Sequence, residues 1–358
     1  MPCAEDVHLK KRLIDCLSGH DTDRVPFVCP MQTATIDLMK KSGSFWPDAH
    51  KDAGKMAVLA ISAHEFRGLE AARVPFENTA EVSAFGAETA HRTLVRQPLV
   101  LGQVVTNADD LDRLEVPDPT RSERCVVVLE ALRRMGDARP DLPLICGIAS
   151  PAALGFQMLG EQDALMDVKK DPALLLGAIN KAELFCADYA RAAVEAGADV
   201  IALVDHVSNS DLLTPQEFER LSLPSMRRAL KSAHQSGCRT ILHLCGDTTE
   251  LLEMLVTSGA NGISVDHHVT VEKLVAAARG RVATIGNLDP NRALRFGTAQ
   301  DVEAEAIRCI ERGISMLSPG CGFAIETPLP NMGAMAKAAQ THPRLQITWR
   351  EVSDVRSD

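Results

Sequence analysis

The chain alternates between short apolar runs rich in β-branched residues and longer stretches in which apolar residues recur at helical spacing. This alternation is typical of parallel strands joined by helical crossovers. The runs that we interpret as strands are residues 25–30, 69–74, 142–148, 198–204, 239–244, 262–265, 282–285 and 313–317. Eight units of strand and helix predict an α/β protein with a (β/α)8 fold, the TIM barrel.

A glycine stands before several of these strands, where a helix should end. Gly197, Gly259 and Gly313 each lie between a helical stretch and an apolar run. Glycine readily adopts the left-handed conformation that ends many helices. The repeated turn therefore supports the order of helix and strand.

The alternation also predicts the domain organisation. We expect residues 1–344 to form one barrel domain with an N-terminal extension, and residues 345–358 to form a polar C-terminal tail. Residues 78–141 are less regular, and we assign them to an insertion after the second strand. We expect this insertion to begin with a β-hairpin around residues 93–105. It would form either a lid or partner surface, or a surface decoration without function.

Composition and charge narrow the class of function. A chain of 358 residues that is 46% hydrophobic can bury one large core. The net charge of −10 and the scattered basic residues argue against a nucleic-acid surface. No apolar run approaches the roughly 18 to 20 residues that span a bilayer, and residues 1–12 do not form a signal peptide. We therefore expect a cytoplasmic protein with no membrane or nucleic-acid partner and with its ten cysteines reduced.

His243 and Cys245 lie two positions apart in an apolar run, and Cys321 stands between two glycines far downstream. On a strand, His243 and Cys245 leave the same face. Imidazole and thiolates suit Zn²⁺, and three protein ligands leave a fourth position for chemistry. From spacing alone, a split zinc site and a core histidine beside two buried cysteines are both open interpretations.

The barrel prediction favours the zinc interpretation, because barrel enzymes place their chemistry at the carboxyl ends of the strands. Both halves of the split motif fall there. Other polar residues follow the predicted strands and are candidates for the same site: Gln32, Glu77, Asp205, His206, Asp266, His267, His268, Asn287 and Asp289. Adjacent residues on a strand point to opposite sides, so we expect at most one of His267 and His268 to face the site.

Several tracts of the chain match the pattern of a known family. They are Asp23-Arg24-Val25-Pro26, Met31-Gln32, Trp46-Pro47, Met56-Ala57, His64-Glu65, Arg73-Val74-Pro75-Phe76, His243-Leu244-Cys245-Gly246, Ser264-Val265-Asp266, Gly286-Asn287-Leu288-Asp289-Pro290 and Ser318-Pro319-Gly320-Cys321-Gly322. Through these tracts, which extend to about Met335, the chain resembles the uroporphyrinogen decarboxylase superfamily. Within it, the chain is most similar to the zinc-dependent methylcobamide:coenzyme M methyltransferases.

This resemblance implies the barrel fold and the zinc ligands His243, Cys245 and Cys321. It also implies that a methyl group moves from a methylated corrinoid to a thiol such as coenzyme M, within the one-carbon metabolism of methanogenesis. The chain has no Asp-x-His-x-x-Gly cobalamin-binding pattern of its own. We therefore expect a separate corrinoid-binding protein as partner.

Their places at the ends of predicted strands suggest roles for the other candidates. Asp266 would be either a fourth zinc ligand that gives way to the thiol, or the acceptor that holds His243. Asp205 would position the substrate or accept its proton, or would bind loop amides.

Four further residues are expected to line the cofactor and substrate site. Asn287 and Asp289 would surround the polar group of the thiol, although Asp289-Pro290 is also typical of a turn before a helix. Gln32 and Glu77 would line the site after the first two strands.

Two alternatives keep the same fold. In the first, the methyl acceptor is homocysteine, another thiol or tetrahydrofolate. In the second, the chain is a corrinoid-binding or metal-binding accessory barrel without catalysis. Porphyrinogen decarboxylation is disfavoured, because the decarboxylases share an arginine-rich N-terminal motif and an active-site tyrosine. Here residues 31–35 contain no arginine, and the only tyrosine, Tyr189, falls in a helical run.

Overall fold

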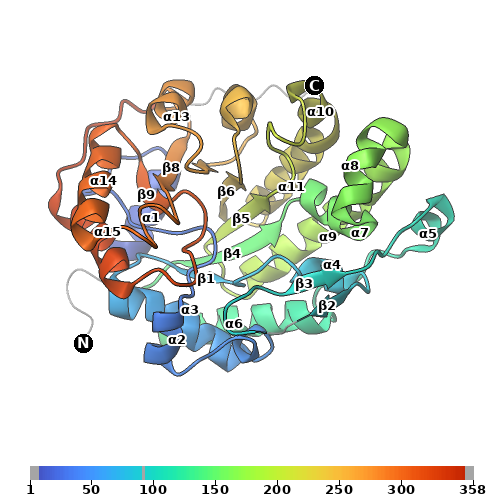
Figure 1. Cartoon of the computed structure of the whole chain (residues 1–358), viewed down its shortest axis with the longest axis horizontal. Coiled ribbons are helices and arrows are strands. Elements are labelled where there is room, and N and C mark those ends of the chain that lie inside the picture. Colours follow the sequence, from blue (N-terminus) through green and yellow to red (C-terminus); the bar gives the residue numbers. More distant parts are fainter. Residues whose placement is uncertain (1–7, 91–92, 351–358) are drawn as a thin grey trace.

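Parallel strands form one curled sheet at the centre of the molecule, and helices surround it (Figure 1). The computed structural model describes residues 8–90 and 93–350. Neighbouring strands of the sheet follow one another along the chain. They are β1 (Ala72–Val74), β4 (Leu144–Ala149), β5 (Val200–Asp205), β6 (Arg239–Leu244), β7 (Gly262–Val265), β8 (Ala283–Leu288) and β9 (Met316–Pro319).

The segment at residues 25–30 closes the ring between β9 and β1. Phe27 pairs with Leu317 in a single parallel bridge, and the Leu317 N–H donates to the Pro26 carbonyl at 2.9 Å. On the other side, the Glu70 N–H donates to the Phe27 carbonyl at 2.8 Å. We expected a full strand here, but Pro26 has no N–H to donate and the pairing is limited to this bridge. The predicted barrel fold is confirmed.

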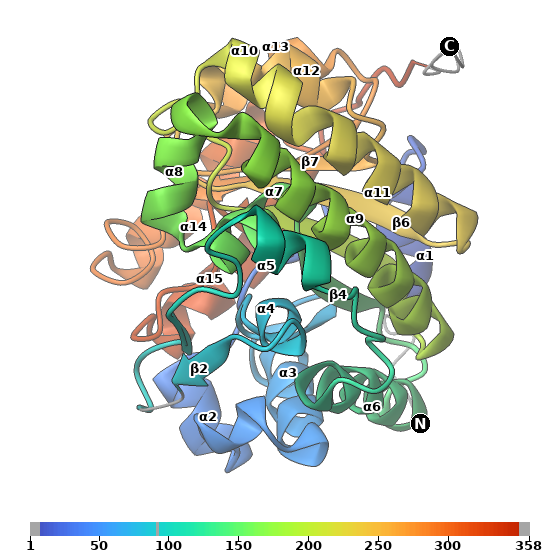
Figure 2. The same cartoon turned by 90° about the vertical axis from the view of Figure 1, so that its right-hand side faces the viewer.

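Helices cover the outside of the sheet, and α7, α9 and α11 lie side by side along one flank (Figure 2). The helices outside the 78–122 region are α1 (Leu9–Leu17), α2 (Ile36–Ser42), η2 (Asp48–His50), α3 (Ala53–Arg67), α6 (Glu123–Ala138), α7 (Pro151–Leu159), α8 (Glu161–Lys170), α9 (Pro172–Glu195), α10 (Pro215–Glu217), η3 (Phe218–Ser222), α11 (Leu223–Gln235), η4 (Thr249–Leu251), α12 (Leu252–Val256), α13 (Val271–Ala278), α14 (Ala299–Glu311) and α15 (Leu329–Thr341).

The predicted glycine turns end these helices. After α9, Gly197 has a φ of 107° and its N–H donates to the Val194 carbonyl at 2.9 Å. The Ala198 N–H donates to the Ala193 carbonyl at 3.0 Å, which completes a Schellman-type C-cap. Because the turn takes up the first residues of each expected run, β5 and β9 begin two or three residues later than predicted.

Helix α1, which belongs to the expected N-terminal extension, closes the amino-terminal end of the barrel. Its side chains Leu13, Cys16 and Leu17 are buried against the inner face of the strands. A Cβ on Gly262 would lie 2.9 Å from Leu17 Cδ2, so this glycine makes room for the helix. The barrel residues in this cluster are Val28, Ala71, Ile145, Val200, Ala202, Ile241, Ala283, Ile285 and Met316. The carboxyl end is therefore the end that is free to hold a site.

The expected insertion contains a hairpin, but α4 (Ala80–Ala84) precedes it and its first strand lies before the predicted stretch of residues 93–105. Its strands β2 (Glu88–Ala90) and β3 (Leu99–Leu101) pair in antiparallel register between α4 and α5 (Ala108–Arg113). Helix α6 packs against α3, β1 and β4, so it takes the place of a barrel helix. The extent of the insertion and its role stay predictions.

The start of the C-terminal tail packs across the amino-terminal end of the barrel. Trp349 is partly buried and packs against the buried cluster that includes α1, and the Arg350 N–H donates to the Gly280 carbonyl at 2.9 Å. The remainder of the predicted tail, residues 351–358, and the predicted reduced thiol Cys3 lie outside the described residues. The other nine cysteines are free thiols. Among the helices described, none is long and apolar enough to cross a membrane.

Candidate metal centre

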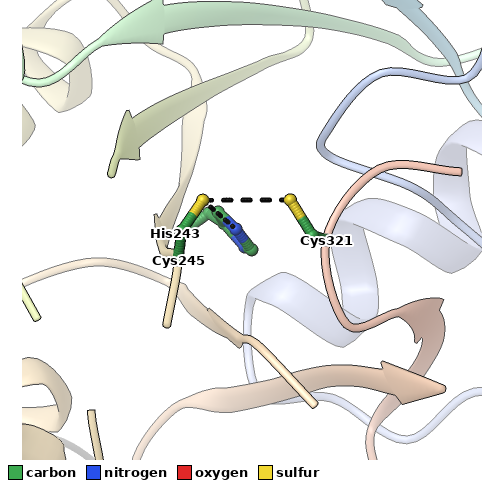
Figure 3. Close-up of side chains that lie close together, drawn as sticks. All are labelled: His243, Cys245 and Cys321. Carbon is green, nitrogen blue, oxygen red and sulfur yellow. Dashed lines mark hydrogen bonds between the residues drawn. The ribbon is translucent and has the colours of Figure 1, made fainter. Parts of the chain in front are cut away.

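The two halves of the split motif meet at the carboxyl end of the barrel (Figure 3). His243 is on β6, Cys245 follows that strand, and Cys321 follows β9. Cys245 Sγ lies 3.4 Å from His243 Nε2 and 3.8 Å from Cys321 Sγ. The three potential ligand atoms all lie within 4.8 Å of one another. One metal ion could therefore contact all three.

These separations fit a tetrahedral zinc ion. Zn–S bonds of about 2.3 Å and Zn–N bonds of about 2.0 to 2.1 Å, at tetrahedral angles, place two sulfurs about 3.8 Å apart and a nitrogen and a sulfur about 3.6 Å apart. The observed 3.8 Å between the sulfurs is also far too long for a disulfide, whose S–S bond is about 2.05 Å. The geometry suits a zinc site, and zinc binding stays a prediction.

The alternative of three buried core residues does not match the surroundings. His243 is fully buried, but the side chains of Cys245 and Cys321 line a cavity of about 610 Å³ at the carboxyl end of the barrel. A metal held by the three atoms would thus have one side toward the cavity. This is the arrangement of a catalytic site with an open position rather than a closed structural one.

Ser264 fixes the orientation of His243. The two residues are register partners on β6 and β7, and Ser264 Oγ lies 2.9 Å from His243 Nδ1. With Nδ1–H donating to Ser264 Oγ, the lone pair of Nε2 points toward the two sulfurs. Sequence reasoning missed Ser264, although it stands two positions before Asp266 in one of the family tracts.

The two thiols are electrostatically unequal. The Cys245 thiol donates to Cys321, and this hydrogen bond lowers the pKa of Cys321 well below its ordinary value. His243 acts in the same direction. The pKa of Cys245 rises, because its proton is held by Cys321 and because burial disfavours a second thiolate. The pair therefore favours one thiolate beside one thiol, and a bound cation would favour deprotonation of the second thiol.

Backbone contacts position both cysteines. The Cys245 N–H donates to the Asp205 carbonyl at 2.9 Å, and the Gly320 N–H donates to the Leu288 carbonyl at 2.7 Å. Gly246 has a φ of 80°, a left-handed conformation that lets the chain turn directly after Cys245. The loops that carry the sulfurs are thus tied to β5 and β8.

The structure places Asp266 beside the cluster of His243, Cys245 and Cys321 but not within it. Its Oδ2 accepts the Gly246 N–H at 3.2 Å, and its Oδ1 lies 2.5 Å from His267 Nδ1 and 3.0 Å from His268 Nδ1. The three residues form a second cluster of potential ligand atoms. Our expectation that His267 and His268 point to opposite sides is wrong, because β7 ends at Val265 and both residues lie in the following turn.

Asp205 is completely buried at the end of β5. Its Oδ1 accepts the N–H groups of Val207 and Ser208 at 2.9 and 2.7 Å, and its Oδ2 accepts the hydroxyls of Ser208 and Ser150. These contacts match the second role that we considered, which was binding loop amides. A catalytic role for Asp205 stays a prediction.

Asn287 and Asp289 hold the loops around the site. The Asn287 amide donates to the carbonyls of Asp266 and Val269. Asp289 Oδ1 accepts the N–H groups of Asn291 and Arg292 at 2.8 and 2.9 Å, which forms a turn, and the next helix, α14, begins only at Ala299. Their expected contact with the thiol stays a prediction.

Gln32 and Glu77 line the same cavity as the two cysteines. The Gln32 amide donates to the Phe323 carbonyl, and its Oε1 has no hydrogen-bond partner among residues 8–90 and 93–350. Glu77 is fully buried and pairs with Arg124 at 2.6 Å. Burial raises the pKa of Glu77, but the charges of Arg124 and His50 and the hydrogen bonds from Thr79 together outweigh this effect, so the pKa lies below its ordinary value.

The cavity also includes residues that we did not single out for this role. Arg73, Glu161, residues 97–100 of the hairpin region and Gly102 line it. His206 Nε2 lies 2.7 Å from Glu161 Oε1. Little in the sequence indicates that the hairpin lines the cavity, because this depends on how the insertion packs against the carboxyl end of the barrel.

Comparison with known proteins agrees with this fold. The uroporphyrinogen decarboxylase family model matches residues 8–342. The chain belongs to this family, as the resemblance of its sequence tracts implied.

The relatives include methyltransferases of this family. The chain is 35% identical over 341 residues to the methylcobamide:CoM methyltransferase MtbA of Methanosarcina acetivorans, with 93% of this chain and 98% of the relative covered. A solved structure of a methyltransferase from Methanosarcina mazei is 34% identical, with a TM-score of 0.89 and coverage of 93% and 98%. A uroporphyrinogen decarboxylase of Myxococcus xanthus is 26% identical over 277 residues, which cover 73% of this chain and 78% of the relative. The similarity to the methyltransferases is thus higher and extends over more of the chain.

Proposed function

We propose that this protein is an enzyme that transfers a methyl group from a methylated corrinoid to a thiol such as coenzyme M. The observation that carries the proposal is the convergence of His243 Nε2, Cys245 Sγ and Cys321 Sγ at the wall of a cavity. The relatives named methylcobamide:CoM methyltransferases support it, because they match nearly the full length of the chain.

In this proposal a zinc ion is held by His243, Cys245 and Cys321. Bound zinc supplies Lewis acidity, which favours the thiolate form of an incoming thiol near neutral pH. Ser264 holds the imidazole of His243 in the tautomer that presents Nε2. The Asp205 and Leu288 carbonyls hold the two cysteine loops in place. Asp266 positions the turn after Cys245 by accepting the Gly246 N–H.

The transfer itself is a displacement at the methyl carbon. The sulfur–carbon bond forms while the cobalt–carbon bond breaks, and cobalt keeps the electron pair of the broken bond. The proton of the thiol is released to solvent. The cobalt chemistry belongs to the corrinoid, and the protein supplies binding, orientation and exclusion of water.

The corrinoid is expected to arrive on a separate corrinoid-binding protein at the carboxyl end of the barrel. This end carries the cavity, whereas the opposite end is packed by α1. We place the reaction in the cytoplasm and, with coenzyme M as acceptor, in the one-carbon metabolism of methanogenesis.

A spectroscopic assay tests the proposal. The full chain, loaded with zinc, is mixed with free methylcobalamin and with coenzyme M, homocysteine or tetrahydrofolate in turn, and the cobalt absorption bands are followed. We expect one thiol to demethylate the corrinoid, and the zinc-free protein to be inactive. Transfer to tetrahydrofolate alone would favour the pterin alternative. If no acceptor reacts even at high protein concentration, the methyltransferase proposal fails.

A further inference from the structure

A second cavity lies at the amino-terminal end of the barrel, beside the end of α1. Its volume is about 570 Å³, which is in the range of small-molecule sites. The turns before β7 and β8 form its walls together with the start of the C-terminal tail. Helix α1 fills the barrel interior at this end, and none of the described residues that line this cavity also lines the cavity of Cys245 and Cys321. The two cavities are therefore separate.

Close contacts fix the tail as one wall of this amino-terminal cavity. A Cβ on Gly280 would lie 2.1 Å from the Thr348 carbonyl oxygen, so the tail passes directly over this turn. The Arg350 N–H donates to the Gly280 carbonyl at 2.9 Å. Trp349 Nε1 donates to Asp21 Oδ1 at 3.3 Å. The shape of the cavity is therefore set by packed segments that are far apart in the sequence.

The wall of the amino-terminal cavity is positively charged, although the protein has a net charge of −10. It includes Arg239, Arg281 and Arg350, and no aspartate or glutamate is among the lining residues that the structure describes. Arg281 is paired at 2.9 Å with the exposed Glu253, which is outside this wall. Arg239 and Arg350 supply the remaining positive charge. A concave surface with one sign of charge attracts ligands of the opposite sign, so the cavity favours an anion.

Arg239 is the cation best placed to bind this anion. It begins β6, and its Nε donates to a neutral group, Ser18 Oγ, at 2.9 Å. The carboxylate of the neighbouring Asp199 contacts Lys10 and accepts the Leu144 N–H. In the described part of the chain, no carboxylate oxygen lies within 4.0 Å of the Arg239 guanidinium nitrogens. The two Nη groups are therefore the donors that a ligand would meet.

The amino-terminal cavity also has an apolar side. Leu17, Val256, Val282 and Trp349 line it. A single inorganic anion at Arg239 would leave this surface and most of the volume to water, whereas an organic group would gain free energy by covering it. The cavity therefore favours a ligand that carries an anionic group and an apolar or aromatic part.

We propose that this cavity is a second ligand site, which binds a phosphate ester of about the size of a nucleotide. The phosphate group contacts Arg239, and the apolar part lies along Leu17 and Trp349. The planar guanidinium offers parallel N–H donors that match two phosphate oxygens, and a doubly charged phosphate balances Arg239 and Arg350. The inference goes beyond the proposed function, because this ligand does not reach the metal centre and takes no part in methyl transfer.

Titration of the full chain with adenosine monophosphate (AMP) tests the proposal by calorimetry. We expect AMP to bind and to raise the melting temperature, because it binds only the folded chain. Adenosine has no phosphate and inorganic phosphate has no apolar part, so each should bind at least about 10-fold more weakly.

Trp349 reports where the nucleotide binds. The chain has two tryptophans, and Trp46 is buried in the core. AMP should therefore change the tryptophan fluorescence of wild-type protein. This change should disappear in Trp349→Phe, while calorimetry still detects binding.

Variants of the cations give the second test. Arg239→Met should weaken AMP binding about 10- to 100-fold, because charge-assisted hydrogen bonds are lost, and Arg239→Lys should keep part of the affinity. Circular dichroism checks that each variant is folded. Arg350→Met, at an exposed position, should also weaken binding and carries the test if Arg239→Met does not fold. Arg308→Met, on the exposed surface of α14, is the control and should bind AMP as the wild type does.

Four outcomes would overturn the proposal. The first is that AMP does not bind at millimolar concentration. The second is unchanged AMP affinity in both Arg239→Met and Arg350→Met, and the third is a fluorescence change that persists in Trp349→Phe, because either result places the nucleotide elsewhere. The fourth is equal affinity for AMP and inorganic phosphate, which would show that the apolar side takes no part in binding.

Discussion

Ser264 Oγ lies 2.9 Å from His243 Nδ1, and the two residues face each other as register partners on neighbouring strands. We expect Ser264→Ala to weaken zinc binding about 10-fold, because an unsupported imidazole loses its fixed tautomer and orientation. Competition with a zinc chelator measures the affinity. Ser225→Ala, which removes a buried hydroxyl on α11, is the matched control. Affinity within twofold of wild type in Ser264→Ala would contradict this role.

Cys321→Ser should lose stoichiometric zinc and methyl-transfer activity together, because a serine hydroxyl is a far weaker zinc ligand than a thiolate. Zinc content by elemental analysis and the cobalt assay check the two losses. Cys238→Ser is the matched control, because Cys238 is buried and its thiol donates to the Ala233 carbonyl, a bond that a hydroxyl can keep. Full zinc in Cys321→Ser would remove Cys321 from the ligand set.

The Asp266→Asn variant tests whether Asp266 is a zinc ligand or only positions the turn after Cys245. The carboxylate already accepts the Gly246 N–H and contacts two histidines, and an amide oxygen can still accept from Gly246. We therefore expect the variant to keep one zinc per chain and an unchanged set of metal ligands by X-ray absorption. Disappearance of an oxygen ligand together with zinc loss would instead identify Asp266 as the fourth ligand.

Glu70→Ala should destabilise the fold by about 3 kcal/mol, because it removes the buried carboxylate that pairs with Arg12 and Arg24 and leaves Arg12 with only the mostly exposed Asp23. Glu70 contacts Arg12 and Arg24 at 2.5 Å and accepts the Phe27 N–H at 3.1 Å, so it also holds the segment that closes the barrel. Denaturant unfolding gives the free energy. Asp23→Asn, at a mostly exposed partner of Arg12, should cost less than about 1 kcal/mol. Similar losses in both variants would contradict the argument.

The pair of His206 and Glu161 should make stability depend on pH. Burial lowers the pKa of His206, but its hydrogen bond to Glu161 and the negative charges of Glu161 and Asp205 together outweigh this effect and raise the pKa above 6.5. The His206 contribution is therefore present below pH 6.5 and is lost as the pH rises through the raised value. The hydrogen bond from His206 lowers the pKa of Glu161 below 4.5, so its contribution is present above that pH and is lost in acid.

Glu161→Gln should consequently lower the melting temperature between about pH 5 and 6 and have little effect above pH 8. Because Glu161 is half exposed, the loss should stay below about 1 kcal/mol. Thermal unfolding across this pH range is the measurement. A larger effect in alkali than at pH 5 to 6 would contradict the sign of both shifts.

The barrel fold and the place of the two cysteines within it could be predicted from local patterns in the sequence. Strand-sized apolar runs, glycines at helix ends and polar residues after the strands are properties of neighbouring positions. They placed Cys245 and Cys321 at one end of a barrel, and the structure brings their sulfur atoms to 3.8 Å. The tracts that resemble the family then limited the expected reaction to methyl transfer from a corrinoid to a thiol.

Other features depend on contacts between distant segments and could not be predicted. The pairing of Ser264 with His243 requires the register between two strands. The place of Arg73 in the wall of the cavity likewise requires the three-dimensional arrangement of the strands. His267 and His268 were misjudged because the pattern did not fix where β7 ends, and a turn has no two-residue alternation.

The packing of α1 into the amino-terminal end of the barrel affects the order of the kinetic steps. Substrates and products have to enter and leave the cavity at the carboxyl end of the barrel, which is also where we expect the corrinoid protein to bind. A thiol must then enter before the larger donor covers the opening, and the methylated product must wait until the donor leaves. Initial-rate measurements should accordingly follow a sequential ordered mechanism rather than a ping-pong one, with the thiol as first substrate and the thioether as last product.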